Sequence, residues 1–578
     1  MKSSNDLRTL LSSIDRKSYP AYKSLQGVYS FGFFTLSIDH VQGDPFAAPS
    51  KLSVFVTHKD AGFPADLFDT EWKRTAFEDD LVRCFFKELA PYQFKAKGSG
   101  KSGLLTISRP GPEILERTAC QCGTQGITLR LEAGFPANGR TINAGELSRI
   151  LFDFLPVCVE KTLMYRKRSA AAMKAAADLA EDQHFIREEL KRRNLVSFVS
   201  NGAILPRESG ISSRPMKQST AFTSPESLQV TLELPHKGAI SGMGIPQGIT
   251  LIVGGGYHGK STLLKALEAG VYNHIAGDGR EYVITEPTAM KLRAEDGRSI
   301  RNVDISMFIN DLPNKKDTAS FSSEDASGST SQAAAVIEGI QAGCHTFLID
   351  EDTSATNFMV RDDLMQKIIH RSSEPITPFI ERARDLYEKA GISTVMVAGS
   401  SGAYFYIADT IIQMQSYLPL DITASTKSFC ESYGAEPIHS APDFRLPASG
   451  RKLDTAKTTA PHSADRGRAF RGRAHGEDRI KTKVFGKDSF SVDKETVDLR
   501  FVEQLADPEQ TAALAQILRF CLEKGLLERC SVEETVSLIQ TELTKKGPGA
   551  FCDSSYQYMG FASPRVQEIF ACINRFRG

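Results

Sequence analysis

The chain has 578 residues, 41% of them hydrophobic and 24% charged, which is the composition of an ordinary soluble protein of about three or four domains. Lysine plus arginine and aspartate plus glutamate are equal at 70 each, which excludes a chain-wide attraction to polyanions and leaves only local basic patches for nucleic acid. No run of about 18 apolar residues is present, which argues against a membrane span.

Residues 1–195 precede any nucleotide motif and are interpreted as an α+β domain that binds nucleic acid or a partner. Strands are predicted at 31–38, 52–56, 103–108 and 127–132, and an amphipathic helix at 77–89. The segment Gly98-Ser-Gly-Lys-Ser102 is similar to a phosphate loop, but Lys95 stands where the first glycine is required. We interpret it as a flexible basic loop, whose Lys97 and Lys101 either contact nucleic acid or belong to a solvated face.

A long helical segment at 159–196 is expected to lead into the next domain, at 196–430, which is built around residues 249–269. The apolar run 249–253 predicts a buried strand, and 261–269 (STLLKALEA) predicts the helix that follows. The loop between them fits the phosphate-binding pattern G-x-x-x-x-G-K-[ST]. Its candidate nucleotide ligands are Gly254, Gly255, Gly256, Tyr257, His258, Gly259, Lys260, Ser261 and Thr262.

The chemistry of this loop requires those residue types. Glycines let backbone N–H groups turn inward around an anion, and the helix N-terminus adds the positive end of its dipole. Lys260 would place a charge on the β- and γ-phosphates of a nucleotide, and the hydroxyl of Ser261 would reach Mg²⁺. The sequence therefore predicts ATP and Mg²⁺ as the ligands.

Two Asp-Gly-Arg turns follow, at 278–280 and 296–298. An Asp-Gly pair favours a tight turn, and an arginine that leaves such a turn beside a phosphate site can contact the nucleotide. Arg280 and Arg298 are therefore candidate ligands, although plain hairpin chemistry explains both turns equally well.

A second phosphate site is predicted at a helix start, where Ser327-Gly-Ser-Thr330 opens an apolar helix whose first N–H groups are free. The strand 346–349 then ends in Asp350 and Glu351. Asp350 would hold Mg²⁺, and Glu351 would polarise the attacking water as the catalytic base. Ser354 follows in a short loop, and another strand at 395–398 ends in Gly-Ser400-Ser401-Gly.

The alternation of strands and helices predicts a mostly parallel sheet, with the ligand at the carboxyl ends of its strands. Residues 440–480 are rich in arginine and glycine and predict a mobile insert, in which Arg466, Arg468, Arg471 and Arg473 either contact RNA or belong to a solvated linker. Residues 481–578 are expected to form a mainly helical C-terminal domain.

The order of phosphate loop, Ser-Gly helix start, Asp-Glu strand and Ser-Ala-Thr-Asn loop resembles the ATP-binding-cassette (ABC) superfamily. The match is closer to the predicted ATPases of the ABC class, a soluble branch that includes a kinetoplastid mitochondrial member associated with RNA editing. Shared segments are GGGYHGKSTLL, GDGRE, ASGSTSQA and DEDTSATNFM, at 254–264, 277–281, 326–333 and 350–359. The fold class implied is an ABC-type P-loop core with an α+β N-terminal domain and a helical C-terminal domain.

The resemblance implies roles for single residues. Lys260 and Ser261 match the Walker A ligands, Asp350 and Glu351 match Walker B and the base, and Ser354 matches the D-loop. Ser327, Gly328, Ser329 and Thr330 match the signature motif, which in ABC proteins contacts the γ-phosphate held by the opposite protomer. The usual Leu-Ser-Gly-Gly-Gln is altered, however, and no switch histidine follows residues 395–398, where Ser400 or Ser401 stands instead. A Q-loop glutamine is also missing, with Asn310 or Asp311 the nearest candidate.

Taken together, these residues predict a cytoplasmic or, alternatively, mitochondrial ATPase. It would act as a homodimer that binds and hydrolyses ATP between its protomers and couples this to clamping of RNA. Two alternatives stay open: an ATP-gated switch for protein assembly without nucleic acid, and a P-loop kinase of a small molecule.

Overall fold

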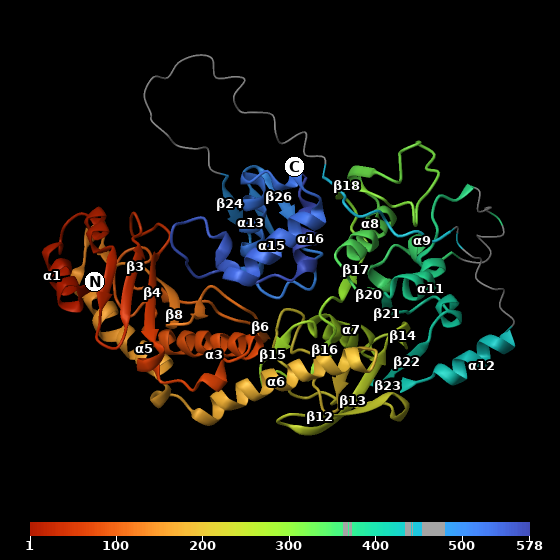
Figure 1. The fold of residues 1–578 in the computed structure, drawn as a ribbon, viewed down its shortest axis with the longest axis horizontal. Coiled ribbons are helices and arrows are strands. Elements are labelled where there is room, and N and C mark those ends of the chain that lie inside the picture. The colour runs from red at the N-terminus through yellow and green to blue at the C-terminus, as the bar shows by residue number, and fades with distance from the viewer. Residues whose placement is uncertain (362–367, 369–372, 434–440, 442, 454–479, 578) are drawn as a thin grey trace, which may run out of the picture. The chain divides into compact units, whose positions relative to one another are not determined.

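The computed structural model describes residues 1–577 except 362–367, 369–372, 434–440, 442 and 454–479 (Figure 1). The chain forms two compact units. The first comprises Met1–His184 with Leu543–Ser563, and the second comprises Phe185–Glu542 with Pro564–Gly578. Helix α6 (Ala170–Arg192) begins in the first unit and ends in the second.

The first unit is built on a mainly antiparallel sheet of strand order β1-β2-β3-β4-β8-β5, with β7 also paired to β8. Residues of β4 are alternately buried and half-buried, so one face of the sheet supplies the core. Helix α3 packs against α5 and against β7. The bounds are β1 (Lys2–Ser3), β2 (Gly27–Ser30), β3 (Thr35–His40), β4 (Ser50–Thr57), β5 (Leu105–Thr106), β7 (Cys120–Cys122), β8 (Gly126–Ala133), α1 (Ser4–Ser13), α3 (Glu71–Leu89) and α5 (Leu155–Leu163).

Three predicted elements of this half were wrong in extent. The strand expected at 31–38 is interrupted by a turn between β2 and β3, where Gly32 has a φ of +86°. The helix expected at 159–196 is broken after α5, because Met164 has the extended backbone that ends a helix. The strand expected at 103–108 is reduced to Leu105–Thr106.

The second unit contains the ATPase sheet, of strand order β17-β20-β21-β14-β22-β23. All neighbours pair in parallel except β22 and β23. The central strands are almost entirely buried, as expected when helices cover both faces of a parallel sheet. The bounds are β14 (Ile249–Val253), β17 (Met290–Leu292), β20 (Thr346–Asp350), β21 (Ser393–Val397), β22 (Thr410–Gln415), β23 (Leu418–Asp421), α7 (Lys260–Ala269), α8 (Gly328–Gln341), α11 (Phe379–Ala390) and α12 (Thr423–Tyr433).

This topology confirms the predicted α/β class and fixes where ligands can bind. Strand β21 lies between β14, which precedes the phosphate loop, and β20, which ends in the acids. Because parallel strands end at one edge of a sheet, the segments after β14, β21 and β20 gather there.

Two further sheets of the second unit lie near the ATPase sheet in the sequence. An antiparallel sheet has the order β12-β13-β11-β16, formed by β11 (Leu195–Ser200), β12 (Gln229–Leu234), β13 (Gly238–Pro246) and β16 (Val283–Thr285). A hairpin joins β18 (Arg298–Val303) to β19 (Phe321–Ala326) just before α8.

The C-terminal region contains more strand than the sequence predicted. Strands β24 (Thr482–Val484), β25 (Ser489–Val492) and β26 (Glu495–Asp498) form a three-stranded antiparallel sheet, and α13 (Pro508–Glu523) packs on β24 and β25 (Figure 1). The helices α14 (Leu526–Arg529), α15 (Val532–Lys546) and α16 (Val566–Arg575) follow. Among the described residues, no helix is long and apolar enough to cross a membrane.

Candidate functional site

The phosphate loop joins β14 to α7 through glycines that no other residue can replace without strain. Gly254 has a φ of +136°, and a Cβ there would stand 2.4 Å from the carbonyl oxygen of Met414 in β22. Gly259, with a φ of +98°, is the residue that precedes α7. The loop therefore lies against β22 and presents the first turn of α7, whose N–H groups have no partners within the helix.

The side chain of Lys260 folds over this loop. Its Nζ donates to the carbonyl oxygens of Gly254 and Gly255, at 2.6 Å and 3.0 Å. The ammonium group is therefore held at the mouth of the loop, where it can exchange a carbonyl for a phosphate oxygen. Ser261, next along the helix, is exposed and its hydroxyl is accessible.

The turn at Ser416 and Tyr417, which follows β22 and which sequence analysis did not single out, contacts the other side of the loop. His258 accepts a hydrogen bond at Nδ1 from the backbone N–H of Ser416 (2.8 Å), and its carbonyl accepts one from Tyr417 (3.2 Å). Ser416 and Tyr417 both have left-handed backbone, with φ of 50° and 71°. The hydrogen bond at Nδ1 places the ring proton on Nε2, and His258 therefore acts as a brace of the loop.

The acids and the loop after β21 are joined directly. Glu351 accepts hydrogen bonds at Oε2 from the backbone N–H groups of Gly399 (2.5 Å) and Ser400 (3.0 Å). Asp350 is buried at the end of β20 and accepts a hydrogen bond from the N–H of Asp352 (3.2 Å). The structure thus brings the segment 399–401 to the predicted base, through backbone groups and not through the hydroxyls that the sequence suggested as γ-phosphate sensors.

The Ser-Gly helix start is tied to the segment after the acids. Ser327 caps α8, and its hydroxyl also lies 3.0 Å from that of Thr330. Ser329 donates to the side-chain oxygen of Asn357 at 2.6 Å. The fully buried Gln332 accepts from the N–H of Ala355 (2.8 Å) and donates to the hydroxyl of Ser354 (3.0 Å). Helix α8 and residues 354–357 are therefore joined by hydrogen bonds into one surface, the α8 wall.

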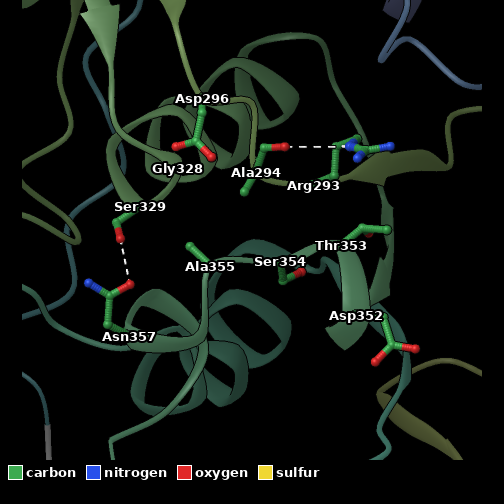
Figure 2. Close-up of a pocket in the computed structure, with 10 residues that line it drawn as sticks. All are labelled: Arg293, Ala294, Asp296, Gly328, Ser329, Asp352, Thr353, Ser354, Ala355 and Asn357. Atoms are coloured by element: carbon green, nitrogen blue, oxygen red, sulfur yellow. Dashed lines mark hydrogen bonds between the residues drawn. The ribbon is translucent and has the colours of Figure 1, made fainter.

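A cavity of about 420 Å³ opens in front of this wall (Figure 2). Figure 2 shows Gly328 and Ser329 on one side with Arg293, Ala294 and Asp296, and residues 352–355 with Asn357 on the other. None of the described residues of the phosphate loop lines it. Within one chain, the two predicted phosphate sites are therefore separate.

The two arginines of the Asp-Gly-Arg turns make structural contacts. Arg280 is buried and donates from Nε to the carbonyl oxygen of Leu205 (3.0 Å). Arg298 is buried in an ion pair with Glu338 of α8. Burial acts to lower the pKa of Arg298, but the carboxylates of Glu338 and Glu295 raise it above its usual value. Of the two interpretations left open, the structure supports hairpin and packing chemistry, so neither arginine is included in the proposed nucleotide site.

The candidate nucleic-acid contacts lie elsewhere. Lys97 is exposed and Lys101 half-buried in a loop of the first unit, where the backbone of Lys97 donates to Glu146 (2.8 Å) and that of Lys101 to the carbonyl of Pro45 (2.8 Å). Arg466, Arg468, Arg471 and Arg473 lie outside the described residues. Asn310, named as a possible Q-loop residue, donates to the carbonyl of Ser306 (2.6 Å) and does not line the cavity.

Three family models match the chain, and they follow one another along it. The ABC-class ATPase N-terminal model matches residues 4–166, the ABC ATPase P-loop domain matches 169–446, and the MRB1590 C-terminal domain matches 481–578. The chain belongs to the ABC-class ATPase family. The match to the P-loop domain supports a nucleotide-binding ATPase of this class in general.

Relatives are distant. An uncharacterized protein, MJ1628 of Methanocaldococcus jannaschii, is 30% identical over 229 residues, which are 38% of this chain and 50% of the relative. The ABC-class ATPase thus spans about half the length of that curated relative. Similar solved structures include cbiO1 of Clostridium perfringens, part of an ABC transporter complex, at 10% identity and a TM-score of 0.25 over 41% of this chain and 92% of that one. Another is the ADP form of MJ1267, an ATP-binding cassette, at 13% identity and a TM-score of 0.22 over 34% and 92%.

Proposed function

We propose that this ABC-class ATPase binds and hydrolyses ATP between two copies of itself. The supporting observation is that, within one chain, no described residue of the phosphate loop lines the cavity in front of α8 and residues 354–357. A head-to-tail pair would set the wall of one copy against the phosphate loop of the other. Each nucleotide would then be enclosed by both copies, and the dimer would be stable only while ATP is bound.

Each group has a role that follows from its position. The N–H groups of α7 and the ammonium of Lys260 neutralise the β- and γ-phosphates, which is the main requirement of phosphoryl transfer. Glu351 orients the attacking water and accepts its proton, and its two backbone donors hold the carboxylate in place. The backbone of residues 399–401, fixed by that carboxylate, replaces the missing switch histidine.

The residues present fit a magnesium ion. The hydroxyl of Ser261 and the carboxylate of Asp350 are oxygen donors of the kind Mg²⁺ prefers. Among the described residues there is no group of three or more His, Cys, Asp or Glu that could hold a metal unaided, so nucleotide phosphates and water would supply the remaining oxygens. When bound, the ion would neutralise charge on the β- and γ-phosphates.

We infer that hydrolysis is coupled to clamping of RNA. Support comes from the resemblance to the RNA-editing-associated member of the family and from the exposed Lys97. An assembly switch without nucleic acid and a small-molecule kinase are the competing functions. A kinase would not need the α8 wall of a second copy, so a monomer that is active would favour it.

The test is the mass of Glu351→Gln protein with and without Mg·ATP, with a short single-stranded RNA added in a third sample. We expect the mass to double with ATP and the RNA to co-elute with the dimer. The matched control is Glu351→Gln combined with Lys260→Ala, which should stay monomeric because nucleotide binding itself is lost. A monomer under all conditions would overturn the proposal of a shared site and would favour the small-molecule kinase.

RNA binding is tested separately by its salt dependence, because each phosphate contact releases counterions. Affinity that falls steeply with salt supports the clamp, and no binding at low salt supports the assembly switch. Changing Arg466, Arg468, Arg471 and Arg473 to alanine, or Lys97 and Lys101 to alanine, shows which segment makes the contacts.

A further inference from the structure

The cavity in front of α8 has one cation among its described lining residues, Arg293, at the carboxyl end of β17. Strand β17 pairs in parallel with β20, so Arg293 comes out at the same edge of the sheet as the acids. The backbone N–H of the next residue, Ala294, donates to the carbonyl of Thr353 (3.0 Å). Arg293 is therefore set beside the segment that follows Glu351.

Arg293 is held by the C-terminal region of the same unit. Its Nη1 is 2.7 Å from Oε1 of Glu503, and its guanidinium carbon is 4.3 Å from the centroid of the Phe501 ring. The side chains of Arg293 and Glu503 are 20% and 29% exposed, so water reaches the pair. Partly exposed pairs of this kind contribute little net free energy, and the arginine can exchange partners at small cost.

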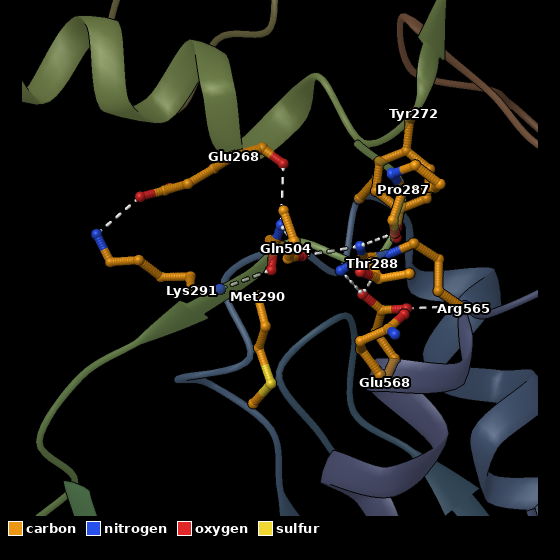
Figure 3. Close-up of polar contacts among 12 residues, drawn as sticks. Glu268, Tyr272, Pro287, Thr288, Met290, Lys291, Gln504, Arg565 and Glu568 are labelled. Atoms are coloured by element: carbon orange, nitrogen blue, oxygen red, sulfur yellow. Dashed lines mark hydrogen bonds and ion pairs between the residues drawn. The ribbon is translucent and has the colours of Figure 1, made fainter. Parts of the chain in front are cut away.

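Gln504, from the same C-terminal segment as Phe501 and Glu503, is hydrogen-bonded to strand β17, which ends just before Arg293 (Figure 3). The side-chain oxygen of Gln504 accepts from the N–H of Lys291 (2.9 Å), and its amide donates to the carbonyls of Glu268 and Ala289, both at 3.2 Å. The ammonium of Lys291 is 2.7 Å from Glu268 and 4.0 Å from Glu503. A displacement of residues 501–504 would therefore also move β17 and Arg293, which follows β17 and lines the cavity.

A second contact of the C-terminal region holds the chain just beyond Arg293. Arg575 of α16 forms a buried ion pair with Glu295, two residues beyond Arg293. The N–H of Glu295 in turn donates to the hydroxyl of Ser331 in α8 (2.9 Å). The C-terminal region thus holds Lys291 and Glu295 on either side of Arg293, while the ion pair of Arg293 itself is the partly exposed one with Glu503.

We propose that Arg293 is a phosphate-binding residue of the nucleotide site and that Glu503 of the C-terminal domain controls its availability; this rests on the proposed ATPase function. A guanidinium is always charged and its fork of donors matches a phosphate. Asp296 and Asp352, which also line the cavity, leave it negative as long as Arg293 is neutralised by Glu503. Movement of residues 501–504 on binding a partner would release Arg293 toward the γ-phosphate and so adjust turnover.

The test measures steady-state ATP hydrolysis by full-length wild type, Arg293→Ala, Arg293→Lys, Glu503→Gln and the double variant Arg293→Ala/Glu503→Gln. Losing a charge-assisted phosphate contact should lower kcat of Arg293→Ala by roughly 10- to 100-fold with little change in KM, because the phosphate loop still binds ATP. Arg293→Lys should be intermediate, and added guanidinium ion should restore part of the activity of Arg293→Ala. Glu503→Gln should raise kcat by about two- to fivefold.

The double variant separates control through Arg293 from a general disturbance of β17. If Glu503 acts through Arg293, Glu503→Gln has no effect once the arginine is gone. An equal gain in both backgrounds would show that Glu503 acts through Lys291 and overturns the proposal, as would wild-type kcat in Arg293→Ala. Wild type that binds ATP but never hydrolyses it would instead overturn the proposed function, and this inference with it.

Discussion

Glu351 has two roles in this structure that a pair of substitutions can separate. Its carboxylate is the proposed hydrolytic group, and it also accepts hydrogen bonds from Gly399 and Ser400, at 2.5 Å and 3.0 Å. Glu351→Gln keeps an acceptor oxygen for these donors but cannot take a proton from water. Glu351→Ala removes both functions.

The magnitudes follow from the exposure of the loop. Gly399 and Ser400 are exposed, so water replaces a lost carboxylate and the two hydrogen bonds together are worth roughly 1–2 kcal/mol. Glu351→Ala should therefore speed amide exchange at these residues by about 5- to 30-fold, whereas Glu351→Gln should change it little. Both variants should lose about 10²- to 10⁴-fold in single-turnover hydrolysis, the usual contribution of a general base.

The assays are hydrogen exchange of the peptide that contains residues 399–401 and quenched-flow hydrolysis of ATP at saturating enzyme. Nucleotide affinity should stay within about twofold in both variants, because the phosphate loop is untouched. Wild-type hydrolysis by Glu351→Gln would refute the assignment of the base. Unchanged exchange in Glu351→Ala would refute the bracing of the loop.

Three further predictions test other parts of the structure. Lys260→Ala should weaken binding of ATP by at least about tenfold in a calorimetric titration, since a charge-assisted phosphate contact is lost. Gly254→Ala should also weaken it, because the new Cβ meets backbone at 2.4 Å, whereas Gly256→Ala, with nothing within 4 Å, should bind normally; equal affinities would contradict the packing argument. Burial raises the pKa of Glu78 to about 8, so the folded protein keeps a proton that the unfolded chain releases near pH 4.5, and stability falls as pH rises between these values. The free energy of unfolding of Glu78→Gln should equal that of wild type at pH 5 and exceed it by up to about 3 kcal/mol near pH 7. The assay is urea unfolding followed by Trp72 fluorescence. An equal difference in free energy at both pH values would contradict the titration of Glu78.

The failures of sequence reasoning have physical causes. The segment 31–38 has the apolar content of a strand, but the turn at Gly32 depends on which neighbours the flanking strands pair with. The strands β24–β26 are short and lie in a polar stretch, so they have no hydrophobic periodicity to detect. Arg298 was a candidate nucleotide ligand because its turn can be recognised from neighbouring residues. Its actual partner, Glu338, is 40 residues away and cannot be recognised in this way.

The sequence by itself determined the phosphate loop, the helix that follows it and the capped start of α8. These depend on glycine φ angles and on free N–H groups within a few residues, which are local properties. Only the tertiary structure decided that β21 lies between β14 and β20, that the backbone of residues 399–400 holds Glu351, and that Arg293 lines the same cavity as α8 while bound to Glu503. The physical reason is that these contacts join residues 48 to 210 positions apart, and no local propensity specifies which distant strands and side chains meet.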